Sequence, residues 1–415
     1  MEVFILEEIR YVVNGPERGM RRSAPVDHFS PEEMSKVVGF HSTMPGYEPT
    51  PLASLPSLAK RLGLGALHVK DESHRFGLKA FKVLGGCYAI AMHLAKLLGK
   101  DISELPFEVL TSDEVKSKLG DITFATTTDG NHGRGVAWTA RMLRQKAVVY
   151  MPKGSAQFRL EKIRGEGAHA EILDMNYDDA VRYTDQQARK HGWVVVQDTA
   201  WEGYTDIPLW IMQGYGTMVV EALDQLKAKG EDMPTHVFIQ AGVGSLAGAV
   251  QGVLRARFGE SAPKVVVVEA SAAACYYESA LAGDGKPRAV GGDLFTLMAG
   301  LACGEVNIIG YEILRDYAAA FVSCPDYVAA RGMRVLGNPL EGDQKVVSGE
   351  SGAVTAGLLG YLMGKEELKD LRGALGLDSS SRVLLFSTEG DTDPDRYRSV
   401  VWDGEFPTVG HLPRP

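Results

Sequence analysis

Short apolar runs alternate with longer amphipathic stretches along this chain, which predicts strands separated by helices. The runs are rich in Val, Ile and Leu and lack strict alternation with polar residues, as is typical of strands covered on both faces. We expect strands at Ala147–Pro152, His169–Asp174, Trp193–Asp198, His236–Gln240, Lys264–Glu269 and Arg382–Thr388. We expect helices at Ala80–Leu98, Gly133–Arg144, Asp178–Lys190, Ile211–Lys229, Ser245–Phe258 and Gly352–Lys365. This order indicates an α/β fold with parallel sheets and right-handed crossover connections.

The regular pattern also indicates how the chain divides. The first 60 residues are irregular and rich in proline, so we expect an arm that wraps around a body rather than a domain. The strand runs at 147–198 and 236–270 are separated by residues 201–229, which places the end of one lobe near residue 205. A chain of 415 residues is long enough for two or three lobes of usual size.

Composition narrows the class of protein. Apolar residues make up 45% of the chain and charged residues 23%, which allows a large core and excludes a disordered chain. The net charge of −9 leaves no basic surplus for a phosphate backbone, so we expect no nucleic-acid partner. The N-terminal residues are acidic and too briefly apolar for a signal peptide, and no apolar run of about 18 residues occurs. We therefore expect a cytoplasmic protein that does not cross a membrane.

The four cysteines are not spaced as metal ligands. Cys87, Cys275, Cys303 and Cys324 lie far apart and form no Cys-x-x-Cys pair, so we expect no metal site. Their ordinary interpretation is small buried side chains in a reducing compartment.

Glycine is enriched, at 47 of 415 residues, about 11% where about 7% is average. The glycine-rich segment Gln240-Ala-Gly-Val-Gly-Ser-Leu-Ala-Gly follows one expected strand and opens an expected helix. Gly242 and Gly244 would let successive N–H groups converge at the helix N-terminus, which favours a phosphate. The spacing fits neither a P-loop nor a dinucleotide fingerprint, so a lone phosphate monoester is the better fit. A plain glycine turn is the alternative.

A second segment, Thr126-Thr-Thr-Asp-Gly-Asn-His-Gly, follows the apolar run Ile122–Ala125 and precedes an expected helix. It brings hydroxyl, carboxylate, amide and N–H groups to the end of a strand, where ligands bind in open α/β sheets. Asp129 and Asn131 could instead form a turn or cap the helix. No second His or Cys lies at ligand spacing from His132, so a packing role is favoured over metal binding.

A third segment contains two lysines three residues apart, Lys79 and Lys82. A pair of surface lysines is the ordinary interpretation. Lys82, however, follows Phe81 and opens an apolar helix, and a desolvated lysine has a lowered pKa and can form a Schiff base.

Together these segments resemble the β-family (fold type II) of pyridoxal-phosphate enzymes, which includes threonine and serine dehydratases, cysteine synthases and the tryptophan synthase β subunit. The family's Ser-Phe-Lys is similar to Ala80-Phe81-Lys82, and its Ser-x-Gly-Asn-His loop is similar to Thr128-Asp-Gly-Asn-His. Its glycine loop is similar to Gly242-Val243-Gly244-Ser245, and its Ser-Gly-Arg-Gly-Asp to Ser387-Thr-Glu-Gly-Asp. The four motifs stand in the family's order over residues 70–391.

The resemblance implies pyridoxal 5'-phosphate as cofactor and a role for each matched residue. Lys82 would carry the Schiff base beside Phe81, and Asn131 would contact the 3-hydroxyl of the cofactor. Ser387 would face the pyridine nitrogen, and such a hydroxyl would not hold that nitrogen protonated as an aspartate would. The weaker electron sink would suit prompt β-elimination. The phosphate would lie at Gly242, Val243, Gly244 and Ser245, and the substrate carboxylate at Thr128, Asp129, Gly130 and His132.

The resemblance also implies the architecture. Each of two lobes would be a mainly parallel twisted sheet flanked by helices. A large cofactor-binding domain would comprise residues 1–86 and 206–415, and a small substrate-side domain residues 87–205. A homodimer is the family expectation.

Within this family, longer segments are similar to those of the diaminopropionate ammonia-lyases. They are Arg75-Phe-Gly-Leu-Lys-Ala-Phe-Lys, Gln197-Asp-Thr-Ala-Trp-Glu-Gly-Tyr and Ser348-Gly-Glu-Ser-Gly-Ala. Lys79 departs from the neutral polar residue expected at its position. The similarity implies elimination of ammonia from 2,3-diaminopropionate, giving aminoacrylate, which hydrolyses to pyruvate and a second ammonia.

Two carboxylates are candidates for this chemistry. Asp129 stands where dehydratases of the family generally carry a small neutral residue. It could attract the second substrate ammonium, or act as a base on the face opposite Lys82, which would permit use of the D as well as the L isomer. Asp198, at the end of an expected strand, is the second candidate, with a strand-end cap as the alternative.

Two other functions fit parts of this pattern. A threonine/serine dehydratase-like lyase of the same fold would have no need of Asp129. A non-catalytic cofactor-binding protein would keep the glycine loop but lose Lys82, Asp129 or Ser387, and all three are present.

Overall fold

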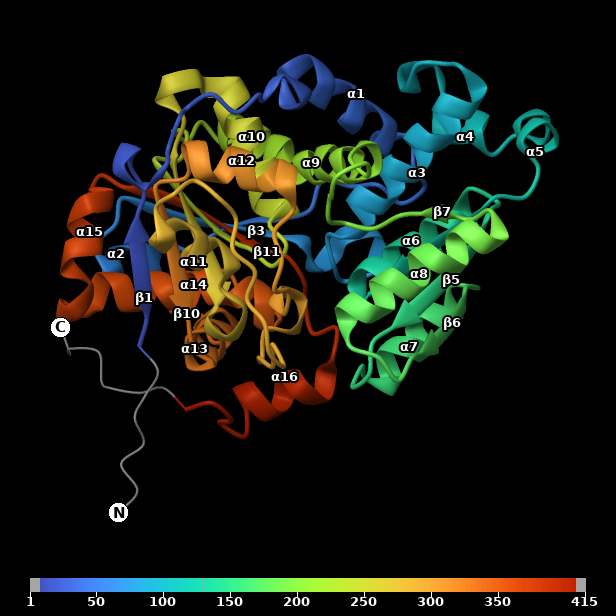
Figure 1. The fold of residues 1–415 in the computed structure, drawn as a ribbon. Helices are drawn as coiled ribbons and strands as arrows, with labels where there is room; N and C mark the ends of the chain where they lie inside the picture. The colour runs from blue at the N-terminus through green and yellow to red at the C-terminus, as the bar shows by residue number, and fades with distance from the viewer. Residues whose placement is uncertain (1–7, 129, 408–415) are drawn as a thin grey trace.

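The computed structural model describes residues 8–128 and 130–407, which fold into two lobes that each contain one sheet (Figure 1). The large lobe has seven strands in the order β1, β10, β9, β8, β11, β3, β2. Its five inner strands run parallel, and the edge strands β1 and β2 pair antiparallel with β10 and β3. The strands are β1 (Arg10–Val13), β2 (Leu52–Ser54), β3 (Ala66–Asp71), β8 (His236–Gln240), β9 (Lys264–Ala270), β10 (Ala320–Cys324) and β11 (Arg382–Ser387).

The small lobe has four parallel strands in the order β6, β5, β4, β7. They are β4 (Thr123–Thr127), β5 (Lys146–Met151), β6 (His169–Ile172) and β7 (Val194–Val195). Figure 1 shows this lobe at the right, with its sheet among α6 (Asn131–Met142), α7 (Gln157–Gly165) and α8 (Tyr177–His191).

Alternate residues of the central strands face two different helical layers, because successive side chains of a strand point to opposite faces. Val265 and Val267 of β9 join one core, and Val266 and Val268 join the other. The first core includes α1 (Pro31–Ser42), α3 (Val83–Leu98), α9 (Asp206–Ala228), α10 (Ser245–Phe258), α11 (Cys275–Ala282) and α12 (Ile308–Tyr317). The second includes α2 (Pro56–Leu62), α13 (Asp326–Gly337), α14 (Glu350–Gly364), α15 (Lys369–Leu375) and α16 (Pro394–Val401).

One apolar core joins the two lobes. Leu84 of α3, Val136 of α6 and Phe124 of β4 belong to the same buried cluster as the first layer of the large lobe. The connection between α3 and β4 contains α4 (Phe107–Leu110) and α5 (Asp113–Leu119). The lobes are therefore packed through α3 and α6 rather than only tethered by the chain.

The predicted α/β class is confirmed, and each predicted strand and helix has a counterpart. The expectation of an irregular arm over the first 60 residues is wrong, since β1, α1 and β2 lie there. β1 and β2 have four and three residues, so they are too short to give a periodic signal. β7 covers two residues, which is shorter than the predicted strand Trp193–Asp198. The domain boundaries at residues 86 and 205 stay a prediction.

Candidate active site

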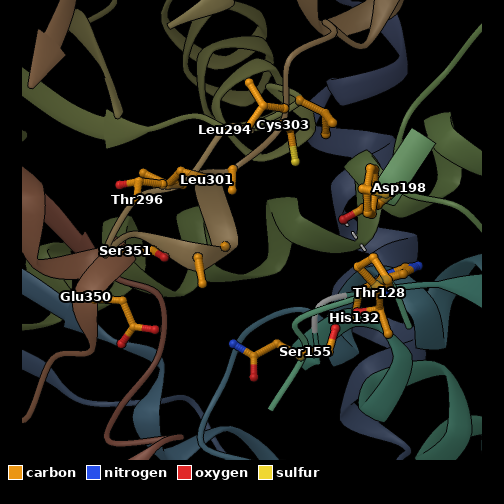
Figure 2. Close-up of a pocket in the computed structure, with 18 of the residues that line it drawn as sticks. Thr128, His132, Ser155, Asp198, Leu294, Thr296, Leu301, Cys303, Glu350 and Ser351 are labelled. Atoms are coloured by element: carbon orange, nitrogen blue, oxygen red, sulfur yellow. Dashed lines mark ion pairs between the residues drawn. The ribbon is translucent and has the colours of Figure 1, made fainter. Parts of the chain in front are cut away.

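A cavity of about 660 Å³ lies where the carboxyl ends of β4, β8 and β11 meet the start of α3. Figure 2 shows Thr128, His132 and Asp198 on one side of it and Glu350 and Ser351 on the other. This volume is usual for a small-molecule site. The predicted site residues that line the cavity are Phe81, Lys82, Thr128, Asn131, His132, Asp198, Gly242, Val243, Gly244 and Ser245.

The segment that brings Lys82 to the cavity is anchored by buried charges. The Arg75 guanidinium donates to the carboxylates of Glu72 and Glu221 at 2.7–2.9 Å, and all three side chains are buried. Phe76 (φ +48) and Lys79 (φ +61) then adopt left-handed backbone conformations, which are costly for residues other than glycine. The anchoring contacts hold this strained turn between β3 and α3.

The two lysines of this segment have different surroundings. The Lys79 ammonium lies at the surface, half exposed, 2.6 Å from the Asp391 carboxylate. The Lys82 ammonium lies in the cavity and is 2.6 Å from Asp198 Oδ2, with side-chain exposures of 18% and 6%. Burial alone would raise the pKa of Asp198, but the positive charge of Lys82 and the His132 ring outweigh it and lower the pKa to about 2. Asp198 is therefore charged at neutral pH.

His132, in the first turn of α6 after the loop that follows β4, lies beside Asp198. His132 Nε2 lies 2.8 Å from the Val196 carbonyl, which can only accept, so this nitrogen carries the proton. His132 Nδ1 lies 4.0 Å from Asp198 Oδ2. The Gly130 N–H donates to Thr128 Oγ1 at 2.9 Å, and Gly130 does not line the cavity. Asp129 lies outside the described residues.

The glycine loop forms one wall of the cavity at the start of α10. Gly244 has φ +87, and a Cβ added there would overlap the Tyr276 phenol. The first N–H groups of a helix have no carbonyl partner within the helix, so this wall offers donors to an anion. Ser245 Oγ donates to the Asp198 carbonyl and accepts from Asn307 Nδ2 at 2.7 Å. The loop is thereby tied to the residue that pairs with Lys82.

Two aromatic side chains of the cavity lining pack against each other. Phe81 and Tyr215 both line it, with their ring centroids 4.7 Å apart. Within the described part of the chain, the buried Tyr215 hydroxyl and Gln240 Oε1 have no hydrogen-bond partner. Buried polar atoms of this kind are rare without a ligand or water to satisfy them.

The structure at the end of β11 contradicts the expectation that Ser387 faces the pyridine nitrogen of the cofactor. Ser387 is buried in the strand and does not line the cavity, whereas Thr388, the next residue, does. Successive residues of a strand point to opposite faces, so a shift of one residue changes which hydroxyl faces the ligand. The Thr388 hydroxyl accepts from Gln240 Nε2 at 2.7 Å and donates to Glu389 Oε2 at 2.6 Å.

Sequence reasoning also missed an ion pair between the lobes. Arg159 of α7 donates to Glu350 of α14 at 3.0 Å, and both side chains line the cavity. Both are largely buried, at 13% and 7% exposure. Their separation of 191 residues leaves no local pattern that could have identified the pair.

Two other features bear on the class of protein. Within residues 8–128 and 130–407, no group of three or more His, Cys, Asp or Glu side chains converges as a metal site would require. No helix in this part of the chain has the length and apolar character needed to cross a membrane.

Comparison with known proteins places this geometry in context. A family model described as pyridoxal-phosphate dependent enzyme matches residues 43–375. A diaminopropionate ammonia-lyase from Salmonella typhimurium is 50% identical over 399 residues, which cover 96% of this chain and 99% of the relative. Two crystal structures of the Escherichia coli diaminopropionate ammonia-lyase are 48% identical and cover 96% of this chain and 98% of theirs. The complex with D-serine has a TM-score of 0.89, and the complex with an aminoacrylate-PLP azomethine reaction intermediate 0.87.

Proposed function

This chain belongs to the family of pyridoxal-phosphate dependent enzymes, and we propose that it eliminates ammonia from 2,3-diaminopropionate to give pyruvate and two ammonia. The observation that carries the proposal is the Lys82–Asp198 pair beside a glycine loop in one cavity. The relatives that share half of the sequence over nearly the whole chain are lyases of this substrate by name.

The residues of the cavity fit the cofactor. Lys82 supplies the amine for its attachment, and Gly242–Ser245 supply backbone donors for its phosphate at the N-terminus of α10. Phe81, Asn131 and Thr388 would hold the ring and its polar atoms. The unsatisfied Tyr215 hydroxyl and Gln240 Oε1 also fit a cavity that normally holds a polar ligand.

The cofactor, when bound, supplies the electron sink that makes the Cα–H bond of an amino acid acidic. Lys82 is the general base for the L isomer, because its side chain lines the cavity. The charged Asp198, 2.6 Å away, favours a proton at Lys82 Nζ. As a neutral amine, Lys82 would accept the Cα proton, Asp198 would stabilise the ammonium that forms, and this ammonium would pass the proton to the departing β-amine. Hydrolysis of the released enamine gives pyruvate and the second ammonia.

A second base would serve the D isomer. On the planar ring of the cofactor, the Cα–H bonds of the two isomers would point to opposite faces. A single lysine cannot reach both faces. Asp129 follows Thr128 in the sequence, and Thr128 lines the cavity, so we assign Asp129 this role. Its carboxylate would act as the base on the face opposite Lys82.

The proposal includes a cytoplasmic homodimer. Cys87, Cys275 and Cys324 are buried and Cys303 is half-buried, all as free thiols, which suits a reducing compartment. Light scattering of the purified protein tests the dimer, since a monomer mass would contradict it.

Steady-state kinetics with a panel of amino acids test the substrate. We expect kcat/KM for L-2,3-diaminopropionate to exceed the values for L-serine and L-threonine by a large factor. A preference for either hydroxy amino acid would instead favour a dehydratase of the same fold.

A further inference from the structure

A directed chain of hydrogen bonds ends in the cavity at Thr388. Gln240 Nε2 lies 3.2 Å from the Phe386 carbonyl and 2.7 Å from Thr388 Oγ1. A carbonyl can only accept, so the amide nitrogen rather than the amide oxygen of Gln240 occupies this position. Thr388 Oγ1 is therefore the acceptor of a bond from Gln240.

At the other end of this series of hydrogen bonds, Glu389 determines the direction in which the Thr388 hydroxyl donates its proton. Glu389 Oε1 accepts from the N–H groups of Ser351 and Gly352 at 2.9 and 2.8 Å. Glu389 Oε2 lies 2.6 Å from Thr388 Oγ1, a length typical of a hydroxyl that donates to a carboxylate. A hydroxyl has one proton and two lone pairs. With its proton given to Glu389 and one lone pair taken by Gln240, Thr388 keeps one lone pair, which can only accept.

The ring nitrogen of the cofactor is the group that this lone pair suits. Lys82 and the glycine loop would hold the aldehyde carbon and the neighbouring phosphate arm, which leaves the nitrogen on the far side of the ring. The Phe81 N–H donates to the Thr388 carbonyl at 3.0 Å, so Thr388 lies directly beside the segment that carries Lys82. Thr388 also lines the cavity.

We infer that Glu389 is a positioning residue, which takes the proton of Thr388 so that the ring nitrogen is bound in its N–H form. This inference rests on the proposed function, because it requires the cofactor. It also departs from the expectation that a hydroxyl at this place leaves the nitrogen without a proton. Glu389 would act through Thr388 as an aspartate does by direct contact, and it would strengthen the electron sink.

The charges around Glu389 permit this role. Burial, and next the charge of Glu350, raise the pKa of the Glu389 carboxyl to about 7. Glu350 is itself paired with Arg159, and the neighbouring Asp391 is paired with Lys79. Because a carboxyl group loses its proton above its pKa, Glu389 is charged and able to accept at pH 8, about one unit higher.

The substitution Glu389→Gln should reverse the direction of the hydrogen bond to Thr388, because the glutamine side chain has the shape of glutamate but carries an amide NH₂. The two N–H groups of α14 require the amide oxygen at the position of Oε1, which turns the amide NH₂ toward Thr388. Thr388 would then accept from Gln240 and from the new amide, and its proton would point to the ring nitrogen. The nitrogen should lose its proton.

The experiment is ¹⁵N NMR of the protein loaded with cofactor labelled at the ring nitrogen, at pH 8. Free cofactor in acid and in base calibrates the pyridinium and pyridine positions. We expect the pyridinium position for the wild-type protein and for Glu350→Gln, a matched loss of a neighbouring carboxylate. We expect the pyridine position for Glu389→Gln, and Thr388→Ser should retain the wild-type signal.

A pyridine position in the wild-type protein would overturn the inference, even if Glu389→Gln failed to fold. An unchanged pyridinium signal in folded Glu389→Gln would also overturn it. A protein that bound no labelled cofactor would instead contradict the proposed function.

Discussion

The ammonium of Lys82 lies 2.6 Å from the carboxylate of Asp198, although 116 residues separate the two in the sequence. Asp198 follows β7 of the small lobe, and Lys82 stands directly before α3. The Ser245 hydroxyl donates to the Asp198 carbonyl, so the glycine loop is fixed to the same point. Asp198 thus joins the proposed base, Lys82, to the proposed phosphate site.

The contrast between the two lysines gives the first prediction. Borohydride reduction of the loaded protein should attach the cofactor to Lys82, because Lys82 lies in the cavity and Lys79 lies at the surface. Peptide mapping by mass spectrometry locates the label. Lys82→Ala should abolish labelling and Lys79→Ala should retain it. A label on Lys79 would contradict the assignment of the site.

The glycine loop gives the second prediction. A Cβ at Gly242 would lie 3.2 Å from the Gly300 carbonyl oxygen and from Leu301 Cα, so Gly242→Ala crowds the cavity wall without forcing a strained φ. We expect at least tenfold weaker cofactor binding, a loss of about 1.4 kcal/mol, with little change in melting temperature. Fluorescence titration of the cofactor-free protein measures the affinity.

Gly244 and Gly39 provide the comparison for that variant. Gly244→Val would combine φ +87 with an overlap on Tyr276, so it should lower the melting temperature as well as the affinity. Gly39 lies on the exposed side of α1 with no atom near an added Cβ, so Gly39→Ala should leave the affinity unchanged and should not lower the melting temperature. If folded Gly242→Ala bound the cofactor with unchanged affinity, the loop would be a simple turn and not a phosphate site.

Asp129 gives the third prediction. If it is the base for the D isomer, Asp129→Asn should lower kcat/KM for D-2,3-diaminopropionate by about 10²–10⁴-fold and spare most of the L reaction. Asp113→Asn, at an exposed aspartate that pairs with Arg144, serves as the control. Equal losses for the two isomers, mostly in KM, would show instead that Asp129 binds the second ammonium.

Asp198 gives a prediction for the dependence of stability on pH. Its pKa is lowered from 3.8 to about 2 in the folded protein. A carboxyl group with a lowered pKa stabilises the fold above its unfolded pKa, and this contribution is lost as the pH falls through the folded pKa. In the cofactor-free protein, the unfolding free energy of the wild type relative to Asp198→Asn should therefore fall by about 2 kcal/mol between about pH 5 and pH 2. Urea titrations at each pH measure this difference, and a constant difference would contradict the pairing.

The sequence predicted those parts of the fold and site that rest on local patterns. β8 (His236–Gln240) and α10 (Ser245–Phe258) match their predicted ranges, because an apolar run, two glycines and a helical period follow one another there. The three loops that line the cavity were found for the same reason. Each follows a strand, β3 and β8 in the sheet of the large lobe and β4 in the sheet of the small lobe, and ligands bind at the carboxyl ends of such strands.

Contacts between distant segments could not be predicted in this way. The Arg75–Glu221 pair joins residues 146 positions apart, and Arg159–Glu350 joins the two lobes. The motif match points to Ser387, whereas Thr388 lines the cavity, because a motif match identifies the segment but not which side chain faces the cavity. Which of the two hydroxyls faces the cavity depends on how the end of β11 is oriented in the sheet, and only the structure shows this orientation.

The stoichiometry of the products tests the central proposal most directly. The purified, cofactor-loaded protein is incubated with L-2,3-diaminopropionate, and pyruvate and ammonia are measured in the same sample. The proposal predicts two ammonia for each pyruvate, and no pyruvate from the Lys82→Ala protein. A yield of one ammonia per keto acid from serine or threonine, with no turnover of diaminopropionate, would contradict it.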